Sequence, residues 1–335
     1  MEFESAPLVS IVTPVYNGEK YLAECIRSVL AQTYKNWEYV IANNCSTDRT
    51  LEILQGYSET DPRIRIHNNE RFVSAVENHH VALRQISAQS KYCKVLHADD
   101  WLFPECLCRM VEVAEANPSV GIVGSYRLDG VRVNLDGLPY PSTVVPGQDI
   151  CRLTLLEKLY VFGSPSSLLI RTSLIQDRSN FYDEMNFPRH SDTAVCYEVL
   201  RDSDFGFVHQ VLTHTRRPPE ARTSFSRKVG THRTEKLLML KKYGPTYLGP
   251  REYQDLVKHQ EKRYFVFLGR NLFRLRGRQF WDYHRGALKS LGLPLSPVTL
   301  IKVSYYTIFD RMVYPLRLLG RALRLAARPR SGVVE

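Results

Sequence analysis

Short apolar segments alternate with amphipathic segments through the first 126 residues, and this alternation limits the chain to few folds. Apolar runs at 8–12, 37–41, 64–66, 92–96 and 120–126 predict strands. Stripes of apolar residues within 21–30, 51–54, 73–87 and 104–115 predict helices between them. Because such alternation builds a mainly parallel sheet with helices on both faces and right-handed crossovers, we predict an α/β fold.

Polar residues directly follow three of the predicted strands, at positions 13–17, 43–46 and 97–100. In open α/β sheets, ligands bind beyond the carboxyl ends of the strands. Three polar clusters at three such ends therefore predict one shared binding cleft.

Charge divides the chain into two parts. Residues 1–230 contain 24 Lys/Arg and 28 Asp/Glu, whereas residues 231–335 contain 21 and 7. We predict a nearly neutral domain at 1–230 and a basic, helical C-terminal region at 231–335. A basic segment indicates an anionic partner, which is either nucleic acid or a lipid surface.

Composition excludes several classes of protein. With 44% apolar residues in 335, the chain can bury a core, which excludes a disordered protein. The seven cysteines are odd in number and lack C-x-x-C spacing, so we expect reduced thiols in a cytoplasmic protein. The acidic N-terminus differs from a secretory signal, and no charge-free run of 18 apolar residues predicts a membrane span.

Three longer segments carry a resemblance to a known family. VSIVTPVYNGEKYLAECIRSVLAQTY, IANNCSTDRTLEIL and KVLHADDWLFPECL resemble the motifs of family 2 glycosyltransferases, in the family's order and spacing, and the likeness extends over residues 8–220. It implies the GT-A nucleotide-diphospho-sugar transferase fold, here with a C-terminal helical basic extension. It also implies a nucleotide-sugar donor, a divalent cation (Mn²⁺ or Mg²⁺) and inversion at the anomeric carbon.

Asp99 and Asp100 occupy the position of the family's acidic metal motif. A hard divalent cation held by such carboxylates bridges the phosphates and stabilises the charge of the leaving diphosphate. The usual D-x-D motif begins where this chain has His97, so Asp99 is the first candidate ligand and Asp100 the second. His97 either contacts the donor or is structural. The alternative for Asp99 and Asp100 is a cap on the helix before Pro104.

The resemblance also places the nucleotide against Thr13, Pro14, Tyr16, Asn43, Asn44 and Asp100. Tyr16 offers an aromatic face and Thr13 a polar contact, although an ordinary turn after a strand is the other interpretation of 13–16. Asn43 and Asn44 stand where the family has two acidic residues, and their amides can both accept and donate hydrogen bonds. Asp48, in the same motif, is expected at a helix N-terminus.

The sequence RHSD at 189–192 resembles the family's catalytic-base motif in part, because Ser191 replaces a glutamate. In this role Asp192 takes the proton of the acceptor hydroxyl as that oxygen attacks the sugar. Asp183 and Glu184 are rival candidates for the base. A helix cap is the other interpretation of Asp192.

We expect the acceptor-facing half of the site in residues 127–188, which have the glycine and proline content of loops. Within them, 163–167 either leaves space for a sugar ring or forms a turn into a strand. Arg216 and Arg217 are expected either to meet phosphate or to be solvated.

The basic region carries apolar and aromatic residues interleaved with arginines at 263–280 and 295–325. This pattern is typical of helices that lie on a membrane surface, and a helical cap packed on the catalytic domain is the alternative. Nucleic-acid binding is disfavoured because no recognition motif accompanies the charge.

The sequence thus predicts a cytoplasmic, peripherally membrane-bound glycosyltransferase of the hexosyltransferase type. We expect it to extend a glycan or lipid-linked acceptor in surface polysaccharide biosynthesis. Two other functions remain open at this point, a non-catalytic sugar-nucleotide-binding protein and a nucleotidyltransferase. The second would need a glycine- and lysine-rich phosphate loop after the first strand, and 13–20 contains only Gly18 and Lys20.

Overall fold

The structure is a computed structural model. It describes residues 6–176, 178, 181–183, 190–217, 226, 228–272, 274, 276–293, 298–299, 301–306, 308–309 and 313. The chain divides into two compact units, residues 1–221 and 222–335, whereas the predicted boundary was at 230/231. Each unit is described by itself.

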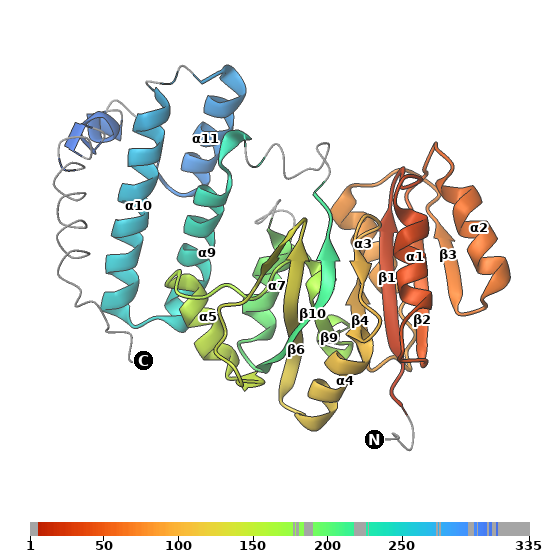
Figure 1. Ribbon diagram of the computed structural model, residues 1–335. Coiled ribbons are helices and arrows are strands. Elements are labelled where there is room, and N and C mark those ends of the chain that lie inside the picture. Colours follow the sequence, from red (N-terminus) through yellow and green to blue (C-terminus); the bar gives the residue numbers. More distant parts are fainter. Residues whose placement is uncertain are drawn as a thin grey trace, which may run out of the picture. The chain divides into compact units, whose positions relative to one another are not determined.

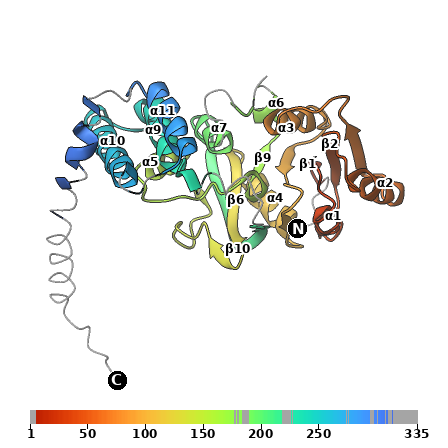
Figure 2. The ribbon, with the colours of Figure 1, turned by 90° about the horizontal axis from the view of Figure 1, so that it is seen from above.

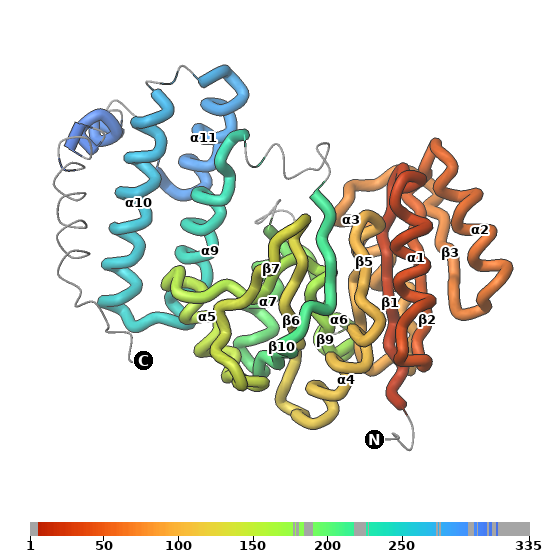
Figure 3. Tube along the Cα trace, viewed as in Figure 1, coloured from red at the N-terminus to blue at the C-terminus, as the bar shows by residue number. Residues whose placement is uncertain are grey.

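The first unit is built on one mixed sheet (Figure 1). Its strands lie in the order β3-β2-β1-β4-β9-β6-β10-β5. Their bounds are β1 (Val9–Val15), β2 (Trp37–Asn43), β3 (Ile64–Asn68), β4 (Tyr92–Val95), β5 (Trp101–Leu102), β6 (Val120–Asp129), β9 (Leu169–Arg171) and β10 (Asp204–Thr215). The short strands β7 (Arg132–Asn134) and β8 (Val144–Val145) pair with β6 and β10, and the tube in Figure 3 follows the chain from β6 into β7.

Helices cover both faces of this sheet (Figure 2). They are α1 (Leu22–Leu30), α2 (Thr50–Thr60), α3 (Ala75–Arg84), α4 (Cys106–Ala116), α5 (Gly147–Leu155), α6 (Ser173–Gln176) and α7 (Ser191–Val199), with the 3₁₀ turn η1 (Pro165–Ser167). Helix α1 and helix α4 share one face, whereas α3 packs on the other against β1 and β2. Because both faces are covered, β1 is buried along nearly its whole length.

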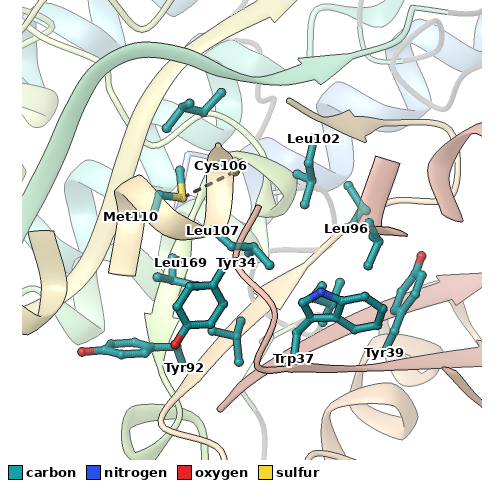
Figure 4. Packing of buried hydrophobic residues seen from close by; sticks show 14 of the residues in the cluster. Tyr34, Trp37, Tyr39, Tyr92, Leu96, Leu102, Cys106, Leu107, Met110 and Leu169 are labelled. Atoms are coloured by element: carbon teal, nitrogen blue, oxygen red, sulfur yellow. Dashed lines mark hydrogen bonds between the residues drawn. The ribbon is translucent and has the colours of Figure 1, made fainter. Parts of the chain in front are cut away.

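The main core lies between the sheet and helices α1 and α4. Its largest side chains include Trp37 and Tyr39 of β2, Tyr92 of β4, and Tyr34 before β2 (Figure 4). Cys106 and Met110 of α4 belong to the same cluster (Figure 4). This packing fixes β1, β2 and β4 as neighbours, and so fixes the loops that follow them.

The predicted α/β architecture is confirmed, and each strand and helix predicted up to residue 126 is present. Residues 127–188, predicted to be rich in loops, also contain β7, β8, α5, η1, β9 and α6. Strand β9 inserts antiparallel between β4 and β6. For 163–167, the structure shows the turn into a strand.

The second unit is helical, with α9 (His232–Tyr247), α10 (Pro250–Leu272) and α11 (Arg278–Ser290). Tyr264, Phe265 and Leu268 of α10, predicted to suit a membrane surface, are instead buried in this unit. His284 of α11 bonds the Tyr264 hydroxyl at 2.8 Å, and burial lowers the pKa of His284 to about 4. In the part of the chain that the structure describes, no helix combines the length and apolar character needed to cross a membrane.

Candidate active site

Three polar loops meet at one edge of the sheet. Strand β1 pairs in parallel with β2 on one side and with β4 on the other. The carboxyl ends of these strands therefore lie side by side, and the residues after them, 16–18, 44–46 and 96–100, are neighbours. A direct link is the hydrogen bond from the Asn17 amide to Ser46 Oγ at 2.9 Å.

The acidic turn after β4 brings His97, Asp99 and Asp100 together, with one potential ligand atom of each within 4.8 Å of the others. Within the described residues, the Asp99 carboxylate has no hydrogen-bond or ion-pair partner. Asp100 is only 2% exposed, and burial raises the pKa of its carboxyl group. Two carboxylates and an imidazole are a donor set that Mn²⁺ accepts, so the residues fit a divalent cation, with Asp99 as the accessible ligand.

Residues far along the chain hold this turn in place. The Arg216 amide donates to Asp100 Oδ1 at 3.0 Å, and Arg216 Nε donates to the Asp99 carbonyl at 3.1 Å. The Arg216 guanidinium also pairs with Glu24 of α1 and lies over the Trp101 ring. In addition, the His97 amide donates to Ser166 Oγ at 3.1 Å. Arg216 is therefore not simply a solvated arginine, because its hydrogen bonds stabilise the acidic turn.

The predicted nucleotide contacts differ in how far they are available to a ligand. Thr13 is buried, and its hydroxyl bonds the Tyr39 hydroxyl at 2.8 Å and the Leu96 carbonyl at 2.7 Å. Its side chain thus ties β1 to β2 and β4. Pro14 is partly buried in β1, whereas Tyr16, the first residue after the strand, is 50% exposed. Of these three, Tyr16 has a side chain that a ligand can reach.

Asn43 and Asn44 are both buried at the end of β2. Asn43 donates to Asn68 Oδ1 at 2.9 Å. The Asn44 amide exchanges two hydrogen bonds with the backbone of Val73, at 2.9 and 3.0 Å. These amides therefore organise the loop after β3. Asp48 accepts from the Thr50 amide at 3.0 Å, at the start of α2, as expected.

Asp192 lies in the first turn of α7, partly buried, and its Oδ1 accepts the Thr193 amide at 2.8 Å. Burial raises the pKa of Tyr182, and the Asp192 carboxylate adds to this shift, as it does for Tyr160. The Tyr182 ring contacts His79 edge-on at 5.5 Å, and His79 Nε2 lies 3.4 Å from His97 Nε2. Asp192 thus acts electrostatically on Tyr182, whose ring lies beside His79, and His79 in turn approaches His97 of the acidic turn.

One of the two rival bases and several residues that were not predicted can be located in the structure. Asp183 is described and partly buried, whereas Glu184 lies outside the described residues. His80 Nε2 accepts the Tyr182 amide at 3.0 Å, which attaches the 181–183 segment to α3. Phe72, 61% exposed, contacts the Tyr16 ring. An exposed phenylalanine in a polar loop was the available signal for Phe72, whereas the roles of the histidines depend on contacts that a sequence does not reveal.

Comparison with known proteins places these features in a family. The sequence model of "Glycosyl transferase family 2" matches residues 10–177, half of the chain. Glycosyltransferase GlyG of Streptococcus pneumoniae serotype 4 is 31% identical over 225 residues, which are 63% of this chain and 71% of GlyG. TuaG of Bacillus subtilis, named for teichuronic acid biosynthesis, is 40% identical over 94 residues, 28% of this chain and 36% of TuaG.

The fold has a counterpart among solved structures. Residues 1–349 of S. aureus TarS, crystallised with UDP-GlcNAc, superpose with a TM-score of 0.61 at 18% identity. The match covers 98% of this chain and 95% of that one, so it includes helices of the C-terminal region. The fold and the sequence matches agree with the motifs: this chain belongs to glycosyl transferase family 2 and is a glycosyltransferase.

Proposed function

We propose that the protein transfers a sugar from a nucleotide diphosphate to a hydroxyl group of a glycan or lipid-linked acceptor, in a single displacement that inverts the anomeric carbon. The observation that carries the proposal is the acidic turn with its accessible Asp99 carboxylate. Asp192 acts electrostatically on Tyr182, which lies beside His79, and His79 approaches His97 of this turn. These features support a diphosphate site beyond the ends of the strands and a carboxylate base near it.

In the donor half, Asp99 would hold a divalent cation, with His97 and Asp100 beside it. The cation would neutralise the charge that develops on the diphosphate as the bond to the sugar breaks. The chain contributes a turn whose geometry is set before the donor binds. Arg216 and Ser166 hold it through hydrogen bonds to Asp100, Asp99 and His97. Preorganised charge of this kind lowers the barrier because it need not reorient during the reaction.

In the acceptor half, Asp192 takes the proton from the acceptor hydroxyl while that oxygen forms the new bond to the anomeric carbon. The bond to the diphosphate oxygen breaks with its electron pair, and the diphosphate leaves. Attack from the side opposite the leaving group inverts the configuration. The Thr193 amide bonds Asp192 Oδ1, which leaves the second carboxylate oxygen for the proton.

We propose that the protein acts in surface polysaccharide biosynthesis and that it works at the cytoplasmic face of the membrane. The name of TuaG supports the pathway, and the donor found with TarS supports a nucleotide sugar. All seven cysteines, each in the described part of the chain, are thiols, which fits a reducing compartment.

The nucleotide-sugar proposal predicts metal-dependent stabilisation. A panel of UDP, GDP, dTDP and CMP sugars with Mn²⁺ or Mg²⁺ should contain at least one donor that raises the melting temperature by about 5 °C or more, because ligands that bind only the folded state stabilise it. Asp99→Asn should lose the metal-dependent part of the shift. Glu59→Gln, an exposed carboxylate on α2, is the matched control and should keep it. No shift with any donor would contradict the proposal.

Membrane attachment is proposed for the segment 298–309. Its exposed apolar residues recur at helical spacing: Val298, Ile301, Tyr305 and Ile308. Outside 298–309, the predicted stretch 295–325 lies beyond the described residues except at position 313. The aromatic stripe of α10 no longer supports attachment, because it is buried.

Loss of this apolar face should therefore release the protein from lipid. The affinity of the double variant Ile301→Asp, Tyr305→Asp for anionic vesicles should be at least about tenfold lower than that of the wild type. The reason is that each apolar side chain buried in the lipid contributes about 1.5–3 kcal/mol to binding. Val131→Asp, which changes an exposed valine in the first unit, is the control. Vesicle co-sedimentation of the full chain measures both. Equal binding by the double variant and the wild type would exclude this segment as the anchor.

A further inference from the structure

Two arginines share a single aspartate at the end of β6. Arg217, which follows β10, donates to the Asp129 carboxylate twice, from Nε to Oδ1 and from Nη2 to Oδ2, the second at 2.7 Å. Asn134 Nδ2 donates to the same Oδ2 at 3.0 Å. Arg127 Nη2 lies 3.5 Å from that oxygen. The carboxylate is therefore committed mainly to Arg217, and Arg127 has the weaker contact.

The charge of Arg127 is incompletely balanced although its side chain is buried. Arg127 is 6% exposed, and its Nε donates to Asn134 Oδ1 at 3.1 Å. Among the residues that the structure describes, its Nη1 has no hydrogen-bond partner. Burial lowers the pKa of Arg127, and the charge of Arg217 adds to this shift. Because a buried charge costs free energy unless a partner balances it, this environment favours an anion beside Arg127.

The pairing of β6 with β10 places Arg127 on the face of the sheet that carries the acidic turn. In the parallel register of the two strands, Arg127 is paired with Thr213. Asp129 is paired with Thr215, two positions further along each strand. Since side chains two positions apart on a strand point to the same face, Arg127 shares the face of Thr215. The Thr215 hydroxyl lies 3.5 Å from Asp100 Oδ2, so the acidic turn is on this face as well.

Arg127 belongs to the acceptor half of the site. The loops of the donor half follow β1, β2 and β4, whereas β6 is separated from β4 by β9. Helix α7, which carries Asp192, contacts β6. Burial raises the pKa of the Tyr160 hydroxyl, the Asp192 carboxylate raises it further, and Arg127 opposes the shift. Tyr160 therefore lies within electrostatic range of both the candidate base and Arg127.

We propose that Arg127 binds an anionic group of the acceptor, a phosphate or a carboxylate, and so selects acidic acceptors over neutral ones. This inference rests on the proposed transfer to an acceptor at Asp192. A planar guanidinium can donate from Nη1 and Nη2 to two oxygens of such a group. Arg217 is a positioning residue, because it holds Asp129 away from full pairing with Arg127. A neutral acceptor would leave the buried charge without a partner, which disfavours its binding.

Small anions can test this site in the full chain saturated with UDP and Mn²⁺. The probes are glucuronate and glycerol 3-phosphate, each compared with its neutral counterpart, glucose or glycerol, by ligand-observed NMR titration. Both anions should bind more tightly than the neutral compounds. Arg127→Gln should weaken anion binding by about tenfold or more, as expected for loss of a charge-assisted contact. Arg132→Gln, which changes an exposed arginine on β7, is the matched control and should bind as the wild type does.

Asp129→Asn gives a test of the opposite sign. This substitution removes the negative charge that competes with the ligand for Arg127, so the anions should bind about threefold more tightly or better. A cluster with only a structural role would not gain affinity when one of its members is changed. Unchanged or weaker anion binding by Asp129→Asn would therefore contradict the proposal, even if Arg127→Gln failed to fold.

Binding of UDP separates the acceptor from the donor as the source of the anion. The affinity of Arg127→Gln for UDP with Mn²⁺, measured by calorimetry, should stay within about twofold of the wild-type value. A larger loss would mean that Arg127 contacts the donor's diphosphate and would overturn the assignment. If the UDP-bound wild type binds neither anion, or Arg127→Gln binds both normally, the anion site is excluded while the proposed glycosyl transfer stands. Failure of every nucleotide sugar to stabilise the wild type would instead contradict the proposed function itself.

Discussion

Asp192→Asn should lower kcat by roughly 10²–10⁴-fold, the usual contribution of a general base, while the affinity for the donor stays within about twofold. Asparagine keeps the oxygen that accepts the Thr193 amide, so the start of α7 should remain intact. What it loses is the ability to take a proton from the acceptor. Steady-state kinetics with the acceptor, together with donor binding by calorimetry, separates these effects.

The matched control is Asp183→Asn, which removes the rival carboxylate in the described segment 181–183. If Asp192→Asn retained turnover and Asp183→Asn lost it, Asp183 and not Asp192 would be the catalytic base. The stereochemistry gives a second readout. Proton NMR of the product should show an anomeric configuration opposite to that of the donor, and retention would exclude a single displacement.

The parts of this protein that could be predicted from its sequence depend on repeated local patterns. Parallel strands that are covered on both faces have mostly apolar sequences, so β1, β2 and β4 could be predicted. Their adjacency follows from the fold class, so the convergence of the loops at 13–17, 43–46 and 97–100 could be predicted as well. The motifs predicted which residues lie in these loops. They did not predict the direction in which each side chain points.

Orientation depends on partners that are distant in the chain. The Asn44 amide, predicted to contact the nucleotide, bonds the backbone of Val73, which lies 29 positions away in a loop whose path no pattern specified. Thr13 turns inward because Tyr39 and Leu96 offer hydrogen-bond partners there. Arg216 reaches the acidic turn from the end of β10, 116 positions after Asp100. Such pairings are fixed by tertiary packing and are absent from single-sequence patterns.

Lys94 is the clearest case of a residue whose environment contradicts its type. It lies in the middle of β4 and is 0% exposed. Its Nζ lies 3.5 Å from Met110 Sδ of α4, a weak acceptor. Lysines usually extend along apolar surface to bring the ammonium group to water, but helices cover both faces here. Burial lowers the pKa of Lys94, since the interior disfavours the charged form.

Lys94→Met should therefore stabilise the fold, by about 1–4 kcal/mol at pH 7, the range seen when a buried ionic group is replaced by an apolar one of similar size. Methionine matches the length of lysine and removes the amine. Urea denaturation of the full chain, followed for the first unit's transition, measures the change. Lys158→Met replaces an exposed lysine and should shift stability by no more than about 0.5 kcal/mol.

The pH dependence distinguishes the charge from packing. Because the folded-state pKa of Lys94 lies below the ordinary value of 10.5, the folded protein binds fewer protons than the unfolded chain. Wild-type stability therefore rises with pH between the two pKa values, and the advantage of Lys94→Met should shrink between pH 7 and pH 9.5. A stability difference that stays constant over this range would mean that methionine merely packs better, and no difference at pH 7 would mean that the interior accommodates the amine without cost.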